Sequence, residues 1–377
     1  MTELNTYFAT CPSGLESVLA NELKLLNAKA IATESSGVGF TGDLKIGYKA
    51  NLWLRSATRV LLRLVDFNVS SEQELYDHII AIPWEQYLSI DHTLAVSANA
   101  RDSFLTHSKY TALKSKDAIV DRFMNKYERR PNVDRYSPDV LVNVHLNNNQ
   151  CTVSLDMSGT SLHQRGYRQQ TGDAPLKEAL AAGIVLLTGY DGSQPFIDGM
   201  CGSGTLPIEA AMIGRNFAPG LLRSDFGFQQ WPGFDEKLWR KLVAEAQDSV
   251  KANTDAPVFG SDISSQIIGF AKENARRAGM RASINFSPRN MFDLHSRGEN
   301  GIVICNPPYG ERMGEIEELK GVYREIGNVF KRNFCGNKGF IFTGNLELLK
   351  SVGLKTSAKH ILYNGPLECR LAAYDLY

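Results

Sequence analysis

The chain has 377 residues, and since one domain usually takes ~100–200 residues we expect two or three domains. Hydrophobic residues make up 43% and charged residues 22%, which is typical of a folded soluble protein and excludes a disordered or collagen-like chain. Basic and acidic residues both number 41, which excludes a uniformly basic nucleic-acid coat protein but allows an enzyme with local basic patches.

Membrane and secretion signals are not found in the sequence. No segment reaches the ~18 apolar residues of a membrane span, and acidic Glu3 stands where a secretory signal would carry basic residues. The six cysteines are dispersed and form no CxxC pair. We therefore expect reduced thiols, no metal site, no membrane partner and a cytoplasmic location.

The first part of the chain, up to about residue 157, mixes short strands and helices. The pattern predicts an α+β arrangement with helices on one face of a sheet, and the last two strands form a hairpin around Asn147–Asn149. We expect strands at 5–10, 37–41, 60–67, 93–99, 140–146 and 150–156, and helices at 14–26, with Ser13 as its cap, 48–54, 75–81 and 109–127.

The second part alternates strands with helices, which indicates a parallel, doubly wound α/β sheet. Two late strands follow the last helix and predict a hairpin at the end of the sheet. We expect strands at 195–199, 258–262, 282–287, 302–305, 339–343, 359–363 and 369–377, and helices at 176–188, 205–213, 264–279 and 319–333.

A glycine-containing turn follows the first strand of this sheet. The strand ends at Asp198 and runs into Gly202-Ser203-Gly204, after which a helix begins. Glycines let a ligand approach the backbone, and a helix start offers free N–H groups. Pro207 stands where a dinucleotide motif has its third glycine. The turn is either a ligand loop or a tight connection, and Asp198 either binds an ammonium group or caps that turn.

Asp262 ends the second strand, a position from which an acid often binds ribose hydroxyls. Its alternative role is to cap the following helix. The two acids are 64 residues apart, so an insertion separates them, and residues 216–239 are rich in Phe and Trp. This aromatic segment is either a lid or, as we favour, a helical layer packed on the sheet.

The sequence Asn306-Pro307-Pro308-Tyr309 follows an apolar strand. Two prolines impose an extended, rigid turn. The Asn side-chain oxygen and the Pro307 carbonyl can accept both hydrogens of an exocyclic amino group, and the Tyr ring can stack on a flipped-out base. The alternative is a rigid turn with no chemical role.

These motifs resemble those of amino-methyltransferases that use S-adenosylmethionine. The resemblance implies that residues 306–309 are catalytic and that no metal is needed, although Asn290 stands where the family often has Asp. It also places a cofactor contact in the segment 174–178 before the first motif. The implied cofactor residues are Leu176, Asp198, Cys201, Gly202, Ser203, Gly204, Thr205, Asp262, Ile263, Asn290, Met291, Asp293 and Asn306.

The whole chain resembles bacterial THUMP-domain RNA methyltransferases of the YpsC and RlmL type, including the junction 161–168 and the segment 363–370. The resemblance implies a ferredoxin-like cap (1–44), a THUMP domain (45–157, with elements up to about 66 shared) and a Rossmann-like class I methyltransferase domain (158–377). It implies methylation of a guanine amino group in 23S rRNA, with S-adenosylhomocysteine as product. The alternatives are a tRNA guanine enzyme, a DNA adenine enzyme and a non-catalytic RNA-binding factor.

Basic residues cluster in two parts of the first half, residues 44–65 and residues 101–135, of which the second has nine basic and five acidic residues. Between residues 44 and 65 there are five basic residues and no acids. Such clusters either contact RNA phosphates or are solvated surface. We also expect the segment 160–377 alone to keep its cofactor pocket. The candidate RNA contacts are Arg55, Arg59, Arg129, Arg130, Arg165 and Arg168.

Overall fold

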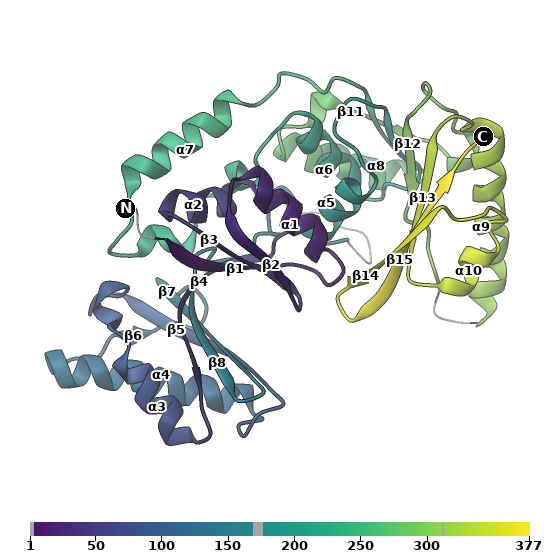
Figure 1. The fold of residues 1–377 in the computed structure, drawn as a ribbon. Helices are drawn as coiled ribbons and strands as arrows, with labels where there is room; N and C mark the ends of the chain where they lie inside the picture. The colour runs from purple at the N-terminus through teal and green to yellow at the C-terminus, as the bar shows by residue number, and fades with distance from the viewer. Residues whose placement is uncertain (1–3, 169–175, 311–312) are drawn as a thin grey trace.

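The computed structural model describes residues 4–168, 176–310 and 313–377. Within these ranges the strands form one sheet of eight and one of seven (Figure 1). We divide the chain into an N-terminal module (4–68), a middle module (69–156) and a C-terminal module (157–377). The first two modules share the eight-stranded sheet, and the third contains the other.

The N-terminal module places two helices against four strands in the order β2-β3-β1-β4. Helix α1 begins at Glu16, and its N-cap position is Leu15 rather than the expected Ser13. Strand β2 was absent from the expected elements, and most of its side chains are exposed. The elements are β1 (Asn5–Thr10), α1 (Glu16–Leu25), β2 (Lys29–Glu34), β3 (Gly37–Gly42), α2 (Leu44–Trp53) and β4 (Arg59–Asn68).

The middle module continues the same sheet, because β4 pairs with β8. Strands β7 and β8 form the expected hairpin, with Asn147 opposite Gln150. Helices α3 and α4 pack together beside these strands (Figure 1). The elements are α3 (Glu72–Ala81), β5 (Thr93–Arg101), α4 (Ser108–Tyr127), β6 (Asn132–Val133), β7 (Val140–Asn147) and β8 (Gln150–Asp156).

The C-terminal module is the predicted doubly wound α/β fold. Its strand order is β11-β10-β9-β12-β13-β15-β14, parallel except for the antiparallel pairs of β15. The elements are α5 (Glu178–Leu187), β9 (Phe196–Asp198), α6 (Thr205–Gly214), α7 (Glu236–Asp248), β10 (Val258–Asp262), α8 (Ser265–Arg277), β11 (Ile284–Pro288), β12 (Ile302–Cys305), α9 (Met313–Asn333), β13 (Lys338–Thr343), α10 (Leu346–Lys350), β14 (Ala358–Asn364) and β15 (Leu367–Asp375).

The aromatic insertion does not have the position that we favoured. Its rings pack on the N-terminal module: Tyr48 of α2 stacks on Phe228 with ring centroids 4.3 Å apart, and Trp239 meets Tyr48 edge-on. The backbone N–H of Asp235 donates to the Tyr48 hydroxyl at 3.0 Å. The insertion is therefore part of an interface between modules, and its rings are not among the residues that line the cofactor-sized cavity described below.

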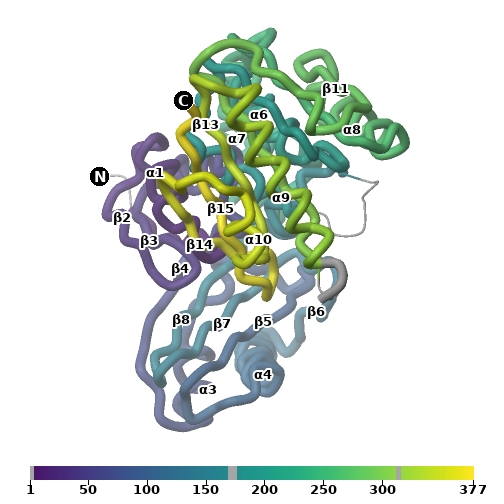
Figure 2. The backbone as a smooth tube through the Cα atoms, turned by 90° about the vertical axis from the view of Figure 1, so that its right-hand side faces the viewer, coloured from purple at the N-terminus to yellow at the C-terminus, as the bar shows by residue number. Residues whose placement is uncertain are grey.

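The described residues form three hydrophobic cores, of which one, between the C-terminal sheet and α9, lies entirely within the C-terminal module. The other two concern how the modules are joined. One runs continuously from the N-terminal module into the C-terminal module, where Leu15 packs so closely on α5 that a Cβ added at Gly183 would lie 2.3 Å from it. The middle module has a core of its own. Figure 2 shows the middle module standing apart below the other two, which lie side by side.

In the described part of the chain, no helix is both long and apolar enough to cross a membrane. None of the six cysteines forms a disulfide, and five of them are buried.

Candidate active site

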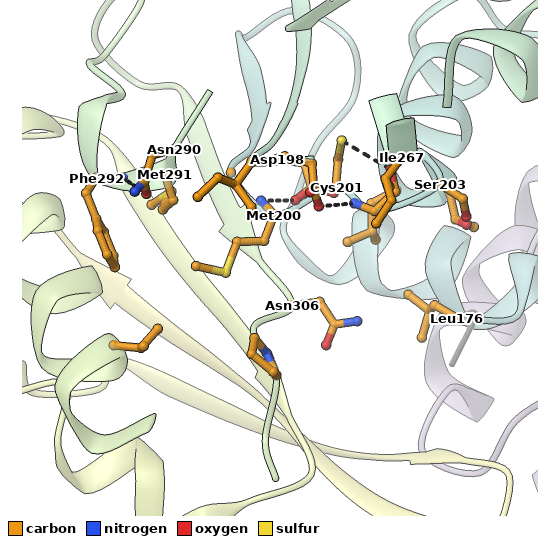
Figure 3. Close-up of a pocket in the computed structure, with 18 residues that line it drawn as sticks. Leu176, Asp198, Met200, Cys201, Ser203, Ile267, Asn290, Met291, Phe292 and Asn306 are labelled. Atoms are coloured by element: carbon orange, nitrogen blue, oxygen red, sulfur yellow. Dashed lines mark hydrogen bonds between the residues drawn. The ribbon is translucent and has the colours of Figure 1, made fainter. Parts of the chain in front are cut away.

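Sheet topology brings the two main sequence motifs together. Strands β9 and β12 are parallel neighbours with Asp198 opposite Ile304, so the segments that follow them emerge at the same edge of the sheet. The Gly199 N–H donates to the Ile304 carbonyl at 2.9 Å and fixes this arrangement. A cavity of about 570 Å³ opens there, between the glycine turn on one side and Asn306 on the other (Figure 3).

The two glycines of the turn have left-handed backbone conformations but different surroundings. Gly202 has φ 51° and Gly204 has φ 87°. A Cβ added at Gly204 would lie 3.0 Å from the Ala271 side chain, whereas one added at Gly202 would meet no described residue within 4 Å. Gly204 thus allows close packing of α6 on α8, and Gly202 presents open backbone to the cavity. The turn is therefore shaped to receive a ligand.

Asp198 is a buried acid at one wall of the cavity. One carboxylate oxygen accepts from the Met200 N–H at 3.1 Å. Burial raises the pKa of Asp198 to about 8, and the nearby negative charge of Asp262 adds to the increase. A ligand with a positive charge would stabilise the ionised carboxylate. The cavity is thus suited to a cationic group at this end.

Asp262 spans two turns and is not the N-cap of α8. One carboxylate oxygen accepts from the Gly202 N–H at 3.2 Å and the other from the Ser264 N–H at 3.0 Å. The N-cap of α8 is Ser264, whose hydroxyl accepts from the Ile267 N–H. Asp262 also lines the cavity, with Ile263 beside it. The capping alternative for Asp262 is therefore wrong.

Asn290 marks another end of the cavity (Figure 3). Its side-chain oxygen accepts from the Phe292 N–H at 3.0 Å, which fixes the turn that follows β11. Met291 and Phe292 line the cavity, whereas Asp293, predicted as a cofactor residue, is not among the lining residues. This end of the cavity is therefore partly apolar, which suits the apolar face of a ligand ring.

Asn306 has the clearest unsatisfied group of the site. Its side-chain oxygen is buried and has no hydrogen-bond partner among the residues that the structure describes, and Figure 3 shows the amide facing the cavity. A buried acceptor without a partner costs ~1–3 kcal/mol, so a donor from a ligand is expected there. Pro308 also lines the cavity, whereas Pro307 and Tyr309 are not among its lining residues. Acceptor, acids and open glycine backbone together fit S-adenosylmethionine and an amino group beside it.

Arg168 connects two walls of the cavity. Its guanidinium donates to the Leu176 carbonyl and, at 3.1 Å, to the Thr205 hydroxyl, and it lies 3.3 Å from a Glu178 carboxylate oxygen. Leu176 and Thr205 both line the cavity. The guanidinium is thus engaged within the protein while its side chain remains 11% exposed, and its contact with RNA phosphate stays a prediction. Residues 174 and 175 of the predicted cofactor segment lie outside the described residues.

Two of the predicted RNA contacts, unlike Arg168, are contradicted by burial. Arg165 is 1% exposed, donates to the Arg55 carbonyl and faces Glu209 at 3.6 Å. Arg55 is 8% exposed and donates to the Phe217 carbonyl at 2.9 Å. Both therefore join the N-terminal module to the C-terminal module.

The other three predicted RNA contacts are more accessible. Arg59 is partly exposed and pairs with buried Asp156. The side chains of Arg129 and Arg130 are 65% and 62% exposed, and each faces an acid, at 3.2 and 3.8 Å respectively. Their contact with RNA stays a prediction.

Most of the predicted cofactor residues lie around this one cavity, including Cys201, Ser203 and Ile263, whereas Gly204 does not line it. Other lining residues were missed. Met200 lies inside the predicted motif and Leu206 directly follows it, and Ile267 lies four residues after Ile263, so their spacing could have indicated them. The remaining missed residues are Gly199, Phe292 and Val322. Among the residues described, no group of His, Cys, Asp and Glu side chains is arranged to hold a metal ion.

Three family models match successive parts of the chain. The RlmL ferredoxin-like domain matches residues 6–61, the THUMP domain 69–156 and the RMKL-like methyltransferase domain 165–373. The THUMP match thus covers the middle module, and the methyltransferase match covers the cavity.

Two curated relatives span nearly all of the chain. The slr0064 protein of Synechocystis, provisionally named an RNA methyltransferase, is 42% identical over 98% of this chain and 97% of its own length. The ribosomal RNA large subunit methyltransferase K/L of Methylococcus capsulatus is also 42% identical over 98% of the chain, which covers 51% of that protein. The chain thus spans about half the length of the K/L relatives.

Two solved structures have the same fold along the full chain. SMU.472, provisionally named a methyltransferase and solved with bound S-adenosylhomocysteine, is 32% identical with a TM-score of 0.91 and covers 100% of this chain and 99% of its own. A Listeria monocytogenes protein, described as a predicted N6-adenine-specific DNA methylase, is 35% identical with a TM-score of 0.90 and coverages of 100% and 97%.

Proposed function

Because this chain belongs to the family of RMKL-like methyltransferases, we propose that it methylates the N2 amino group of a guanine in 23S ribosomal RNA. Its cofactor is S-adenosylmethionine, the donor of this family. The K/L relatives, named for large-subunit ribosomal RNA, support the choice of RNA, although this chain matches only about half of their length. The THUMP match to the middle module supports an RNA substrate as well.

The observation that carries the proposal is the buried, unpartnered side-chain oxygen of Asn306. It lies in the same cavity as Asp198, Gly202 and Asp262. An amino group of a base that enters this cavity can donate to the Asn306 oxygen. The cavity therefore holds an acceptor for the nucleophile beside the residues that are predicted to hold the methyl donor.

Positioning supplies most of the catalysis in this scheme. When bound, the cofactor supplies a methyl group already activated by its sulfonium. Asn306 and the Pro307 carbonyl hold the two amino hydrogens, which directs the nitrogen lone pair toward the methyl group. Tyr309 stacks on the extruded base, and the rigid proline pair keeps these groups in register. The nitrogen loses a proton after transfer, to these acceptors or to water.

Asn306→Ala tests the proposal. We expect turnover to fall by about 10²–10³-fold, the usual effect of removing an oriented polar group at the reacting centre. Cofactor affinity, measured by calorimetry, should remain near wild type. Asn290→Ala is the matched control and should weaken cofactor binding with a smaller effect on turnover at saturating cofactor. Substantial methylation by folded Asn306→Ala would contradict the assignment.

A DNA adenine methyltransferase is the second candidate, favoured by the description of the Listeria structure. The same acceptors would hold the amino group of adenine. Methyl transfer from labelled cofactor to 23S rRNA, tRNA and duplex DNA, followed by nucleoside mass analysis, separates the alternatives. We expect N2-methylguanosine in 23S rRNA, and methyladenine in DNA would favour the second candidate.

A further inference from the structure

The segment after β13 lies beside the Asn-Pro-Pro-Tyr motif, although it is 36 residues further along the chain. Strands β12 and β13 are parallel neighbours, with Cys305 opposite Ile341. The ends of both strands therefore reach the same edge of the sheet. The segment Thr343-Gly344-Asn345, which we call the tyrosine seat, leaves β13 there.

Asn345 joins the tyrosine seat to the motif. Its side-chain N–H donates to the Tyr309 carbonyl at 3.2 Å. Its side-chain oxygen accepts from the backbone N–H groups of Glu347 and Leu348 at 3.0 and 3.3 Å, which caps α10. The donor half of one amide thus holds the motif, while the acceptor half is fixed by a helix.

Two buried hydroxyl groups fix the backbone of the tyrosine seat. The Asn345 backbone N–H donates to the Thr343 hydroxyl at 3.1 Å, and that hydroxyl lies 2.7 Å from the Tyr323 hydroxyl. Thr343 and Tyr323 are fully buried. The backbone of Asn345 is therefore attached to the core through a chain of hydrogen bonds. The backbone cannot shift without breaking one of them.

Gly344 receives the Tyr309 ring. A Cβ added at Gly344 would lie 3.3 Å from the Tyr309 ring edge and 2.8 Å from the Leu367 side chain. The Tyr309 ring thus lies where a side chain at position 344 would be. The seat contacts both the carbonyl and the ring of Tyr309, which limits its backbone shift and its ring tilt.

We propose that Asn345 is a positioning residue for methyl transfer, holding Tyr309 so that its ring meets the target base beside Asn306. This inference rests on the proposed function and adds a residue to its site. Asn345 touches neither cofactor nor base and acts only through Tyr309. A shift of about 1 Å at such a group can lower the rate by ~10²-fold.

The alternative role of Asn345 is only to cap α10. The two roles use different atoms, so substitutions can separate them. Asn345→Ser keeps a good N-cap residue but is too short to reach the Tyr309 carbonyl. Asn345→Asp keeps the capping oxygen and replaces the donor by an acceptor. Asn345→Ala removes both functions. Glu347→Ala, two residues away in the first turn of α10, is the control for the loss of a surface ion pair, since Glu347 lies 3.0 Å from Lys320.

The first measurement needs no RNA substrate. Hydrogen exchange is followed at the Tyr309 and Gly310 amides of the full chain with S-adenosylhomocysteine added. We expect exchange about tenfold faster in Asn345→Ser and Asn345→Asp, with α10 amides unchanged. Equal exchange in wild type and Asn345→Ser would overturn the positioning role, whatever the substrate is.

The second measurement uses whichever nucleic acid the wild-type enzyme methylates. We expect kcat to fall by ten- to a hundredfold in Asn345→Ser and Asn345→Asp, while KM for the cofactor and the melting temperature stay near wild type. If only Asn345→Ala loses activity, together with thermal stability, Asn345 is a helix cap and the inference is wrong. A wild-type enzyme inactive on ribosomal RNA would contradict the proposed function and leave the exchange result to decide this one.

Discussion

The N-terminal and middle modules share one sheet but are attached to the catalytic module in different ways. The N-terminal module contributes Tyr7, Leu15 and Tyr48 to a core that continues into the C-terminal module. The middle module closes its own core around residues such as Phe123 and Val142. Strand continuity through β4 and β8 joins them, and Trp231 is packed against both cores.

This difference assigns the two modules different expected roles. The N-terminal module belongs to the folding of the catalytic module, and the middle module to substrate delivery. Because their apolar surfaces are buried against each other, we expect the N-terminal and catalytic modules to form one folding unit. The middle module can be expected to fold and bind by itself, as an appended unit. The earlier expectation for the segment 160–377 therefore changes, since that fragment would expose the shared core to water.

The largest expected effects come from deleting the middle module alone and from deleting both modules that precede the catalytic one. Asn68 and Gln150 are paired neighbours on antiparallel strands, so residues 69–149 can be replaced by a two-residue Asn-Gly turn. We expect this variant to remain folded and bind cofactor normally, but to lose most of its RNA affinity. The segment 160–377 alone should be insoluble. Solubility, calorimetry and RNA filter binding provide the readouts.

A soluble 160–377 fragment with normal cofactor affinity would show that the shared core is dispensable. Loss of cofactor binding in the variant without residues 69–149 would show instead that the middle module supports the catalytic unit. Either result would contradict the division into one folding unit and one appended unit.

Single core substitutions test the same difference at smaller scale. Tyr48→Ala should remove about 3–5 kcal/mol of stability from the shared unit, because the ring stacks on Phe228 and meets Trp239. Phe123→Ala should cost a similar amount in the middle module alone. By calorimetric unfolding in the presence of cofactor, we expect only Tyr48→Ala to lower the cofactor-stabilised transition. Equal effects of both variants on that transition would contradict separate cores.

How far the sequence predicts the fold depends on where each element lies. Strands Val258–Asp262 and Ile302–Cys305 match their predicted bounds, because central strands of a parallel sheet are apolar throughout. Strand β2 at Lys29–Glu34 was missed, because an exposed edge strand carries no apolar pattern. Helix α7 was not among the predicted elements. The rings of the aromatic segment before it indicated burial, but the sequence does not show which module they contact.

The residues of the candidate site also differ in how far the sequence predicts them. Motif residues such as Gly202 and Asn306 are predictable, because strand, turn and helix are contiguous in sequence. Val322 and Asn345 come from elements that only the folded sheet brings to the site. Arginine identity alone does not reveal burial, which is why Arg165 was grouped with exposed arginines although its guanidinium is enclosed between modules.

The pH dependence of cofactor binding tests the role of Asp198 in the catalytic module. Burial raises the pKa of Asp198 to about 8, so the free protein holds this carboxyl protonated below that pH. A cationic cofactor favours the ionised form and releases the proton on binding. Affinity should therefore rise between about pH 6 and pH 8, by at most tenfold per pH unit, and then level off.

Asp198→Asn should weaken binding and remove this dependence, with RNA affinity unchanged. It should also stabilise the free protein at pH 8. Folding raises the pKa above the unfolded value, so the ionised carboxylate costs stability that grows as pH rises from about 4 to about 8. Calorimetry across this range checks both signs, and an unchanged slope in Asp198→Asn would assign the dependence to another group.

The smallest expected effect concerns the exposed arginines of the middle module. If this module delivers RNA, Arg129 and Arg130 contact phosphates, and each lost contact should lower the slope of log affinity against log salt by ~0.7–0.9. The pair Arg129→Ala/Arg130→Ala should weaken RNA binding about three- to tenfold at low salt. Arg240→Ala is the matched control, since Arg240 is a similarly exposed arginine on α7 of the catalytic unit and should change neither value.

Each of the two middle-module arginines faces an acid in the free protein, so RNA must compete with Asp91 and Asp121 for them. This competition keeps the expected effect small, because exposed ion pairs contribute only ~0–1 kcal/mol. An unchanged salt slope in the double variant would mean that this surface is merely solvated and that RNA reaches Asn306 by another face.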